Sequence, residues 1–170
     1  MNWQAVLIFP RLKNIDEIER IREQYDPLYG KTAPHITLVF PFNSDIPTED
    51  IHSHAQGALA GCSRFPLRMQ GITGQEGSCL FLNVVRGNDA IIDLHRRLYS
   101  GPLAPFRNRA YTFFPHLTVG RFSYETSFES ALESLIAFDT VFETVVDEVS
   151  IIGVESNGHS TIAASVRIGD

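Results

Sequence analysis

The chain has 170 residues, of which 44% are hydrophobic, 20% charged and 11% aromatic, and its formal net charge is -6. A chain of this length buries roughly 70% of its unfolded surface, and its two cysteines, Cys62 and Cys79, form no CxxC pair, which argues against a disulfide framework or a zinc cage. The acidic balance argues against tight, sequence-blind binding to DNA or long RNA but allows binding of a nucleotide or one RNA end.

The first ten residues lack the basic region of a signal peptide, and their apolar run over residues 5–9 is too short to span a membrane. This run, ended by Pro10, instead predicts a buried strand over residues 3–9. We therefore expect a cytoplasmic protein that has no membrane partner, and we expect it to be a monomer.

Cap residues, breakers and apolar periodicity delimit the following elements. In the first half they predict a helix from Asn14 to Tyr25, a strand over residues 34–40 closed by Pro41, and a helix from Thr48 to Gly57 or Gly61. In the middle of the chain they predict strands over 65–72 and 80–85 around a hairpin loop at 73–78, and then a helix from Asn88 to Leu98. A loop over 101–110 and a strand over 113–122 follow. A capping box at 126–129 introduces the last helix, and the final strands, over 142–154 and 162–168, flank an Asn157-Gly158 turn.

The order β α β α β β α β α β β mixes strand pairs with single helices. Such an order favours an α+β fold with a mainly antiparallel sheet over a regular βαβ array. No low-complexity tract or linker interrupts the chain, so we expect residues 1–170 to form a single domain.

One short pattern occurs twice. Residues 34–38 read Pro-His-Ile-Thr-Leu, and residues 115–119 read Pro-His-Leu-Thr-Val. Composition alone predicts on the order of 0.02 copies of Pro-His-x-Thr in such a chain. The repetition therefore points to a paired function for the two stretches.

The alternation of side chains along a strand predicts to which side each motif residue projects. His35 and Thr37 would project to one side while their aliphatic neighbours project to the other, and His116 and Thr118 would do the same. If the two strands face each other, two hydroxyls can donate hydrogen bonds to a phosphate. One imidazole can then accept a proton while the other donates one, because the unperturbed histidine pKa is about 6.5. The alternative is that each histidine is a hydrogen-bonded core residue and each threonine a sheet former.

These residues resemble the 2H phosphoesterase superfamily, which contains the RNA 2',3'-cyclic phosphodiesterases also called 2'-5' RNA ligases. The matching motifs are His-x-Thr-x at residues 35–38 and 116–119. The resemblance implies two pseudo-symmetric lobes, each an antiparallel sheet with flanking helices, around a central groove. It also implies hydrolysis of a nucleotide or RNA 2',3'-cyclic phosphate, with possible reverse ligation, and no metal or other cofactor. By the same resemblance His35 is the proton donor, His116 the acceptor, and Thr37 and Thr118 bind the substrate.

Two features of the motifs depart from or extend this pattern. After the first motif, Phe40 is followed by Pro41-Phe42, where ligase-like members continue with Phe-Leu-Gly. After the second motif comes Arg121, where relatives often carry an arginine. Strict alternation points Arg121 away from His116, so only a bulge or a strand end would bring it to the phosphate.

Basic residues in the loops before the motifs, Lys31, Arg107 and Arg109, can attract a phosphate or can simply be solvated. Two other functions stay open at this stage. One is a nucleotide- or RNA-end-binding module without turnover, and the other is a metal-dependent hydrolase that uses His35 and His116 as ligands. The second is disfavoured because threonine is a poor companion ligand and no carboxylate lies close in sequence.

Overall fold

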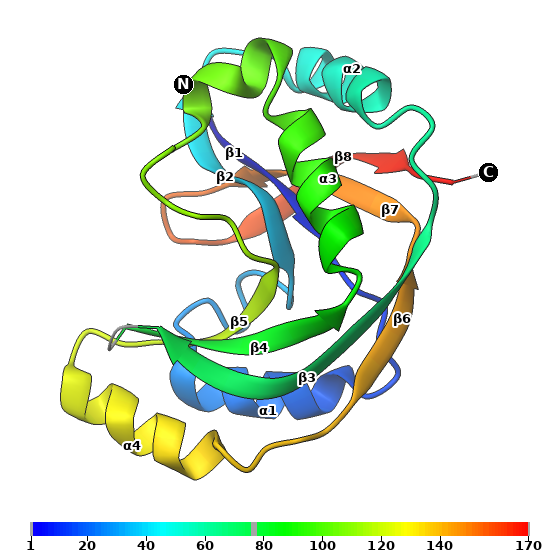
Figure 1. Cartoon of the computed structure of the whole chain (residues 1–170). Helices are drawn as coiled ribbons and strands as arrows, with labels where there is room; N and C mark the ends of the chain where they lie inside the picture. The colour runs from blue at the N-terminus through cyan, green and yellow to red at the C-terminus, as the bar shows by residue number, and fades with distance from the viewer. Residues whose placement is uncertain (1, 76–77, 170) are drawn as a thin grey trace.

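The computed structural model of the chain describes residues 2–75 and 78–169. Its strands are β1 (Asn2–Ile8), β2 (Ile36–Ser44), β3 (Phe65–Gln75), β4 (Cys79–Arg86), β5 (His116–Arg121), β6 (Phe142–Val146), β7 (Glu148–Val154) and β8 (Ser160–Arg167). The helices are α1 (Ile15–Tyr25), α2 (Thr48–Ala58), α3 (Asn88–Leu98) and α4 (Glu125–Leu135), with a 3-10 helix over Gly101–Phe106. The strands form one eight-stranded sheet in the order β6-β3-β4-β5-β2-β1-β7-β8 (Figure 1).

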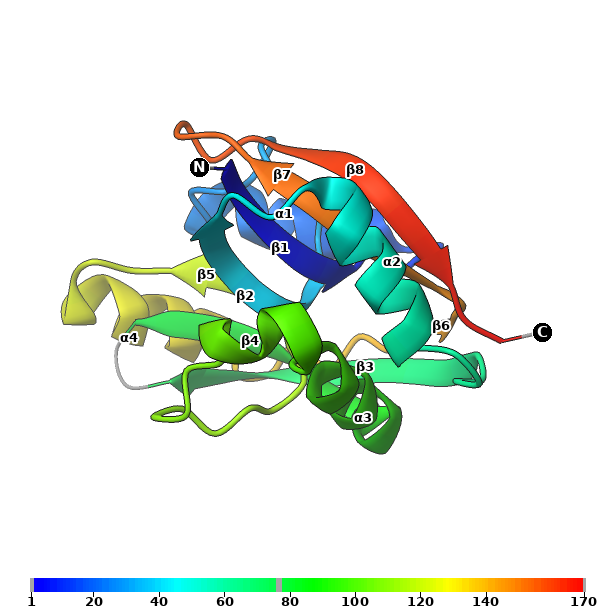
Figure 2. The same cartoon turned by 90° about the horizontal axis from the view of Figure 1, so that it is seen from above.

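Every neighbouring pair in this sheet is antiparallel. Strand β6 stands at one end of the order and β7 next to the opposite end, yet only Asp147 separates them in the chain. The two ends must therefore approach each other, and the sheet is strongly curled (Figures 1 and 2). The predicted α+β class and antiparallel sheet are confirmed.

The sheet consists of two matching halves, β6-β3-β4-β5 and β8-β7-β1-β2. They join at a single registered pair, Ile36 opposite Leu117. In one half Ile36 also faces Ile8 of β1, and in the other Leu117 faces Leu82 of β4. The helices follow the same pattern, because α3 contacts β2 while α1 contacts β5, and α2 contacts β7 while α4 contacts β3. The halves are thus the two pseudo-symmetric lobes that the resemblance implied.

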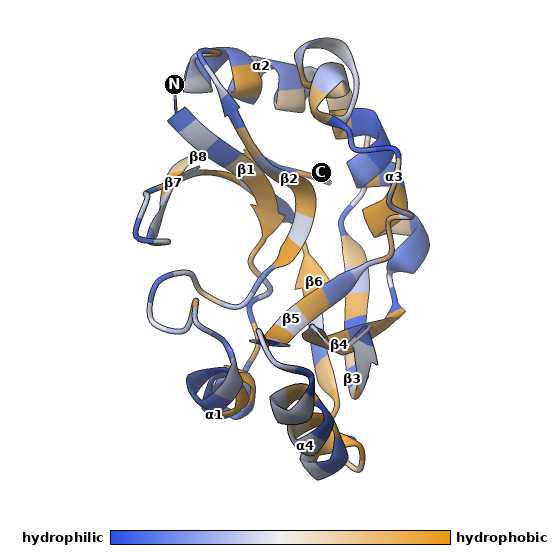
Figure 3. Ribbon diagram, turned by 90° about the vertical axis from the view of Figure 1, so that its left-hand side faces the viewer, coloured by the Kyte–Doolittle hydropathy of each residue, from blue (hydrophilic) through white to orange (hydrophobic). Residues whose placement is uncertain are grey.

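All four of these helices cover the same face of the sheet. Their apolar residues join inward-facing strand residues in one large core, to which α1 contributes Ile18 and Ile21 and α3 contributes Ile91 and Leu94. Figure 3 shows the hydrophobic residues concentrated in the strands at the centre of the fold. A smaller cluster, formed by Ala5, Leu7 and Ile152, lies on the opposite, helix-free face of the sheet. No helix in the described ranges is both long enough and apolar enough to cross a membrane.

Three strand predictions differ from the structure. The strand expected over residues 113–122 begins only at His116 and ends at Arg121. Strand β2 was expected to end before Pro41 but continues to Ser44, because Pro41 lies at a register shift between Gln4 and Val6 of β1, where no ladder donor is needed. Residues 142–154, expected to form one strand, are divided at Asp147 into β6 and β7. The residues that join the main core change there from even numbers, Phe142 and Val146, to odd numbers, Val149 and Ile151, so the chain leaves one lobe and enters the other.

The predicted helix caps also differ in detail. Thr48 and Asn88 are the first helical residues of α2 and α3 rather than their N-caps. The hydroxyl of Thr48 accepts a hydrogen bond from Gln4 (3.0 Å), and the amide of Asn88 donates to a carbonyl outside its helix. Asn14 is the N-cap of α1, but its side chain also bonds elsewhere. These side chains thus make other hydrogen bonds in place of capping bonds.

The predicted start of α4 and the predicted loop between β3 and β4 are modified as well. The capping-box residues 126–129 lie inside α4, which begins at Glu125. The hairpin between β3 and β4 is tighter than the predicted loop at 73–78, since Gln75 pairs with Cys79; its tip, residues 76–77, lies outside the described residues.

Candidate active site

The two repeated motifs meet at the junction of the lobes. His35 immediately precedes β2, His116 begins β5, and the residues that follow them are the registered pair Ile36 and Leu117. Extending this antiparallel register by one residue in each direction places Thr37 across from His116 and His35 across from Thr118. The structure therefore brings the four predicted site residues together, although they come from stretches far apart in the sequence.

The side chains alternate in the same way in both motifs. Ile36 and Leu117 are fully buried in the core, whereas the histidine and threonine on either side of each are only half-buried. The imidazoles and hydroxyls thus project from the helix-free face of the sheet. Both imidazoles are half-buried, not fully enclosed by the core.

The two imidazoles are held by equivalent hydrogen bonds. Nδ1 of His35 lies 2.8 Å from the carbonyl oxygen of Ala33, and Nδ1 of His116 lies 2.8 Å from that of Phe114. Because a carbonyl only accepts, Nδ1 carries the proton and Nε2 of the neutral ring has a free lone pair. Within the described part of the chain, neither these Nε2 atoms nor the hydroxyls of Thr37 and Thr118 have a hydrogen-bond partner. Four polar groups are therefore available to a ligand.

Aromatic rings fix the orientation of each imidazole. Phe9 meets His35 edge-on with 6.1 Å between ring centroids. His116 is more tightly enclosed, with Phe81 at 3.9 Å and Phe114 at 4.7 Å. The rings restrict imidazole rotation, so each Nε2 keeps a defined direction.

Burial and nearby positive charge make both histidines less basic. Burial, with added repulsion from Arg121 and Arg22, lowers the pKa of His35 to about 4. Burial and Arg121 also lower the pKa of His116. Both imidazoles are therefore neutral near pH 7 in the free protein, and Arg121 lies within electrostatic range of both.

Arg121 reaches this face because β5 contains an irregularity. Phe81 of β4 pairs with Thr118, whereas Leu80 pairs with Gly120, so Val119 is an extra residue. This shift restores Arg121 to the face that carries Thr118, which strict alternation alone would not allow. Strict alternation therefore excluded Arg121 from the predicted site. Gly120 was the available signal, because glycine within a strand often marks a bulge or a close approach.

A buried ionic cluster at the end of α1 holds the guanidinium of Arg121. Arg121 donates to Asp26 Oδ1, Arg22 Nε donates to Asp26 Oδ2 at 2.9 Å, and the Leu28 N–H donates to Oδ1 at 3.1 Å. The side chains of Asp26 and Arg22 are each 1% exposed, whereas that of Arg121 is 31% exposed. Burial alone would raise the pKa of Asp26, but Arg121, the Leu28 N–H and Arg22 outweigh it, so the pKa is lowered. Arg121 therefore has a fixed anchor on one side and an accessible edge on the other.

This set of groups matches the chemistry of a phosphate diester. The Arg121 guanidinium and two hydroxyls can donate hydrogen bonds to anionic oxygens, and arginine is shaped for that task. The two imidazoles can exchange protons with groups on either side of phosphorus. In the described ranges, no cluster of three or more His, Cys, Asp or Glu residues is placed to share a metal ion.

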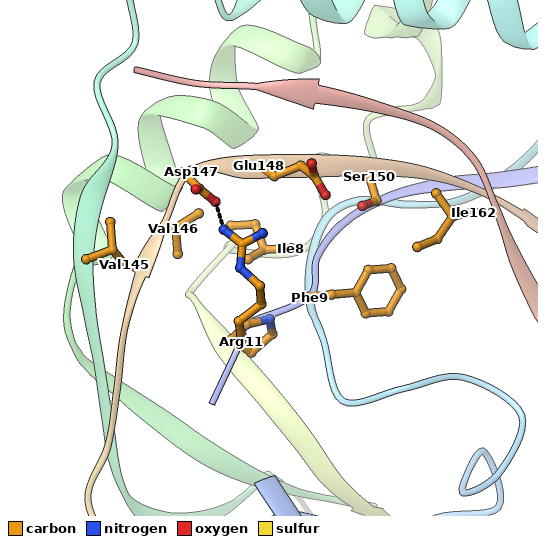
Figure 4. A pocket seen from close by; sticks show the side chains of 10 residues that line it. Ile8, Phe9, Arg11, Val145, Val146, Asp147, Glu148, Ser150 and Ile162 are labelled. Atoms are coloured by element: carbon orange, nitrogen blue, oxygen red, sulfur yellow. Dashed lines mark hydrogen bonds and ion pairs between the residues drawn. The ribbon is translucent and has the colours of Figure 1, made fainter. Parts of the chain in front are cut away.

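A separate cavity of about 120 Å³ lies where β6 passes into β7 (Figure 4). Phe9, Arg11, Asp147, Glu148 and Ser150 are among its lining residues, and Arg11 forms an ion pair with Asp147. Two carboxylates in the wall make this cavity unsuitable for a phosphate. Through Phe9 it adjoins the His35 side of the site.

Comparison with known proteins agrees with this arrangement. Residues 10–158 match the sequence profile of the 2'-5' RNA ligase superfamily. The chain is 27% identical over 173 residues to a protein of Halalkalibacterium halodurans that is provisionally named as a phosphoesterase, with 99% of this chain and 98% of the relative covered. A similarly named protein of Bacillus cereus strain B4264 is 28% identical over 171 residues, with 97% and 96% covered.

Solved structures share the fold at low sequence identity. Escherichia coli LigT, crystallised with ATP, superimposes with a TM-score of 0.63 at 19% identity, covering 99% of both chains. A Thermus thermophilus protein gives a TM-score of 0.68 at 12% identity, again covering 99% of both chains. With the profile match over most of its length, the chain belongs to the 2'-5' RNA ligase superfamily of 2H phosphoesterases.

Proposed function

We propose that this phosphoesterase hydrolyses a 2',3'-cyclic phosphate, on a nucleotide or an RNA end, by metal-independent acid–base catalysis with His35 and His116. The observation that carries the proposal is the matched pair of imidazoles, each tied at Nδ1 to a backbone carbonyl and open at Nε2. The ligands of LigT structures support a nucleotide substrate, since LigT has been crystallised with ATP and with 3'-AMP.

In the proposed reaction the phosphate lies between the two Nε2 atoms. Thr37, Thr118 and Arg121 donate hydrogen bonds to its non-bridging oxygens. His116 accepts a proton from water, whose oxygen forms a bond to phosphorus, while His35 gives a proton to the ribose oxygen whose bond to phosphorus breaks. If an RNA 5'-hydroxyl attacks phosphorus in place of water, loses its proton to His116, and the bond from phosphorus to the 3' oxygen breaks, the product is a 2'-5' linkage.

The bound substrate also favours the protonated form of His35, which proton donation requires. His35 is neutral in the free protein because its pKa is about 4. A bound phosphate anion favours the protonated imidazole and raises that pKa. We therefore expect His35 to become protonated mainly in the complex, so free protein and complex should differ in their pH dependence.

Kinetics with 2',3'-cyclic nucleotides, with products identified by phosphorus NMR, tests the proposal. His35→Ala and His116→Ala should each lower the rate at least about a hundredfold. Thr37→Val and Thr118→Val should cost less, roughly tenfold, since each loses one hydrogen bond. His159→Ala, which alters an exposed turn histidine, should retain full activity. Full activity of both motif-histidine variants on a confirmed substrate would refute the mechanism.

Two further outcomes separate the alternatives. Activity that survives excess chelator supports the metal-independent reaction, whereas its loss and recovery with added metal would assign the histidines as ligands. Tight binding of the cyclic nucleotide without turnover would identify a binding module. The cytoplasmic location and monomeric state stay predictions.

A further inference from the structure

Two side chains at the end of α3 contact segments of both motifs from behind the site. Nδ1 of the buried His95 donates to the carbonyl oxygen of Leu38 at 2.8 Å. The same ring stacks on Phe113, with 3.7 Å between centroids and an interplanar angle of 4°. Tyr99, the C-cap of α3, accepts a hydrogen bond from the Phe40 N–H at 3.0 Å. One helix end thus holds the strand of the first motif and the loop that leads into the second.

The course of β2 explains why these contacts exist. One edge of β2 pairs with β1, but the other pairs with β5 only at Ile36. The register of β2 with β1 shifts at Leu38 and again at residues 40–41, so Leu38 and Phe40 have no registered partner in β1 either. Buried backbone groups need partners. His95 and Tyr99 supply them where β5 has diverged.

An equivalent residue occupies the other lobe. Counting from the first residues of α1 and α3, Arg22 and His95 are both eighth in their helices. Arg22 donates to the carbonyl of Thr32 at 2.7 Å, three residues before His35. His95 stacks on Phe113, three residues before the second motif histidine. Each helix therefore holds the loop that leads into the motif following it.

The C-caps of the two helices are equivalent as well. Asp26 ends α1 and holds Arg121, five residues after His116. Tyr99 ends α3 and holds Phe40, five residues after the first motif histidine. Each helix thus contacts both motifs, and the lobes differ in chemistry, since α1 uses an ionic cluster and α3 uses aromatic rings and neutral hydrogen bonds.

We propose that His95 and Tyr99 are positioning residues of the two-histidine site, in which His95 sets the relative placement of the two motifs. The proposal rests on the proposed function for its kinetic consequences only. His95 touches no reacting atom; it acts through the Leu38 carbonyl on the first motif and through Phe113 on the loop whose next carbonyl, that of Phe114, orients His116.

Two variants of His95 separate its two contacts. His95→Asn keeps a donor close to the position of Nδ1 but loses the ring that stacks on Phe113. His95→Phe keeps a stacking ring but loses the donor to Leu38. The side-chain nitrogen NMR signals of His35 and His116 in the free protein report the placement of each motif without any need for activity.

We expect the two variants to give opposite patterns. The asparagine variant should shift the signals of His116 more than those of His35, and the phenylalanine variant should do the reverse. Tyr99→Phe removes one hydroxyl with little risk to folding, and it should also shift His35 selectively. On a cyclic nucleotide, kcat should fall roughly tenfold to a hundredfold with little change in KM, because small misplacements of catalytic groups are costly while the phosphate-binding groups remain.

His54→Gln is the matched control. His54 also bonds a carbonyl of α3, that of Leu98 at 2.9 Å, but it lies on α2 and contacts neither motif. This variant can lower the melting temperature but should leave both histidine signals and kcat unchanged. Unshifted signals in the folded His95 and Tyr99 variants, or equal shifts in all variants including the control, would overturn the proposal. If His35→Ala and His116→Ala were fully active, the proposed function would fail, while the NMR pattern would still decide the positioning role.

Discussion

Replacement of Asp26 by asparagine tests the ionic cluster that anchors Arg121. The Asp26 carboxylate accepts hydrogen bonds from Arg22, Arg121 and the Leu28 N–H, and its side chain is 1% exposed. Asparagine has nearly the same shape but carries no charge, and its amide presents a donor to a guanidinium. Asp26→Asn therefore leaves the buried cation of Arg22 without its main partner.

The expected loss is large for a single substitution. Breaking a buried ion pair by removing one partner costs about 3–5 kcal/mol. Because Glu19 still pairs with Arg22 at 2.9 Å, we expect the lower end, about 3 kcal/mol. For a chain of this length that free energy corresponds to a decrease in melting temperature of roughly 6–12 °C.

The sign of the pH dependence provides a second check. The pKa of Asp26 in the folded state is lowered, so the cluster stabilises the protein above the unfolded carboxyl pKa of about 3.9 and loses its effect as pH falls through the folded value. The difference in unfolding free energy between wild type and Asp26→Asn should thus be greatest near neutral pH and should narrow below about pH 4.

Thermal unfolding followed by circular dichroism measures the effect, with Asp93→Asn as the matched control. Asp93 also pairs with two arginines, Arg96 and Arg97, both at 2.6 Å, but its side chain is 33% exposed on the surface of α3. Exposed pairs contribute about 0–1 kcal/mol, so this variant should melt within roughly 4 °C of wild type. Equal decreases for the two variants would show that burial of the Asp26 cluster adds no stability.

Three other properties can be tested: the pKa values of the two motif histidines, the packing of α4 against the sheet, and the folding of the chain as a single domain. In NMR titrations of the free protein, His35 should titrate near pH 4 and His116 below 6.5, and saturating inorganic phosphate should raise both; unchanged values in the phosphate complex would place the anion elsewhere. Gly74→Ala should lose roughly 1–3 kcal/mol in urea unfolding because its methyl group would overlap an aromatic ring of α4, whereas Gly57→Ala, with open space around it, should be neutral or stabilising by up to about 1 kcal/mol. If the chain is a single domain, Trp3 fluorescence and circular dichroism should report one coincident transition, and two separated transitions would contradict that prediction.

Much of the fold could be predicted because local patterns and tertiary packing agree. The span of α1, residues 15–25, follows from apolar spacing between a polar start and Asp26-Pro27, and α3 was predicted equally well. The division of residues 142–154 was missed because both parts are apolar and only the phase of their alternation changes. The structure shows the change, since Phe142 and Val146 join the main core from one part and Val149 and Ile151 from the other.

The candidate site was predictable only in part, for a physical reason. His35, Thr37, His116 and Thr118 could be proposed because the alternation within each motif is local. Local alternation excluded Arg121, because its direction depends on a bulge set by pairing with β4, for which Gly120 was the one signal in the sequence. The anchors behind the site, such as His95 on α3, depend on contacts between elements far apart in sequence, and no short pattern records these.

The approximate two-fold relation between the lobes has a consequence for the proposed displacement at phosphorus. In the reverse of an in-line displacement, the oxygen that departed becomes the entering oxygen, and the oxygen that entered departs. Each lobe offers the same pair of groups, an imidazole nitrogen and a hydroxyl, so a phosphorus atom on the axis meets nearly the same surroundings from either side. In the proposed reaction, bond making and bond breaking can then share one set of residues. Hydrolysis and joining differ in the nucleophile, water or an RNA hydroxyl, so the choice between them depends on which nucleophile the residues around the site admit.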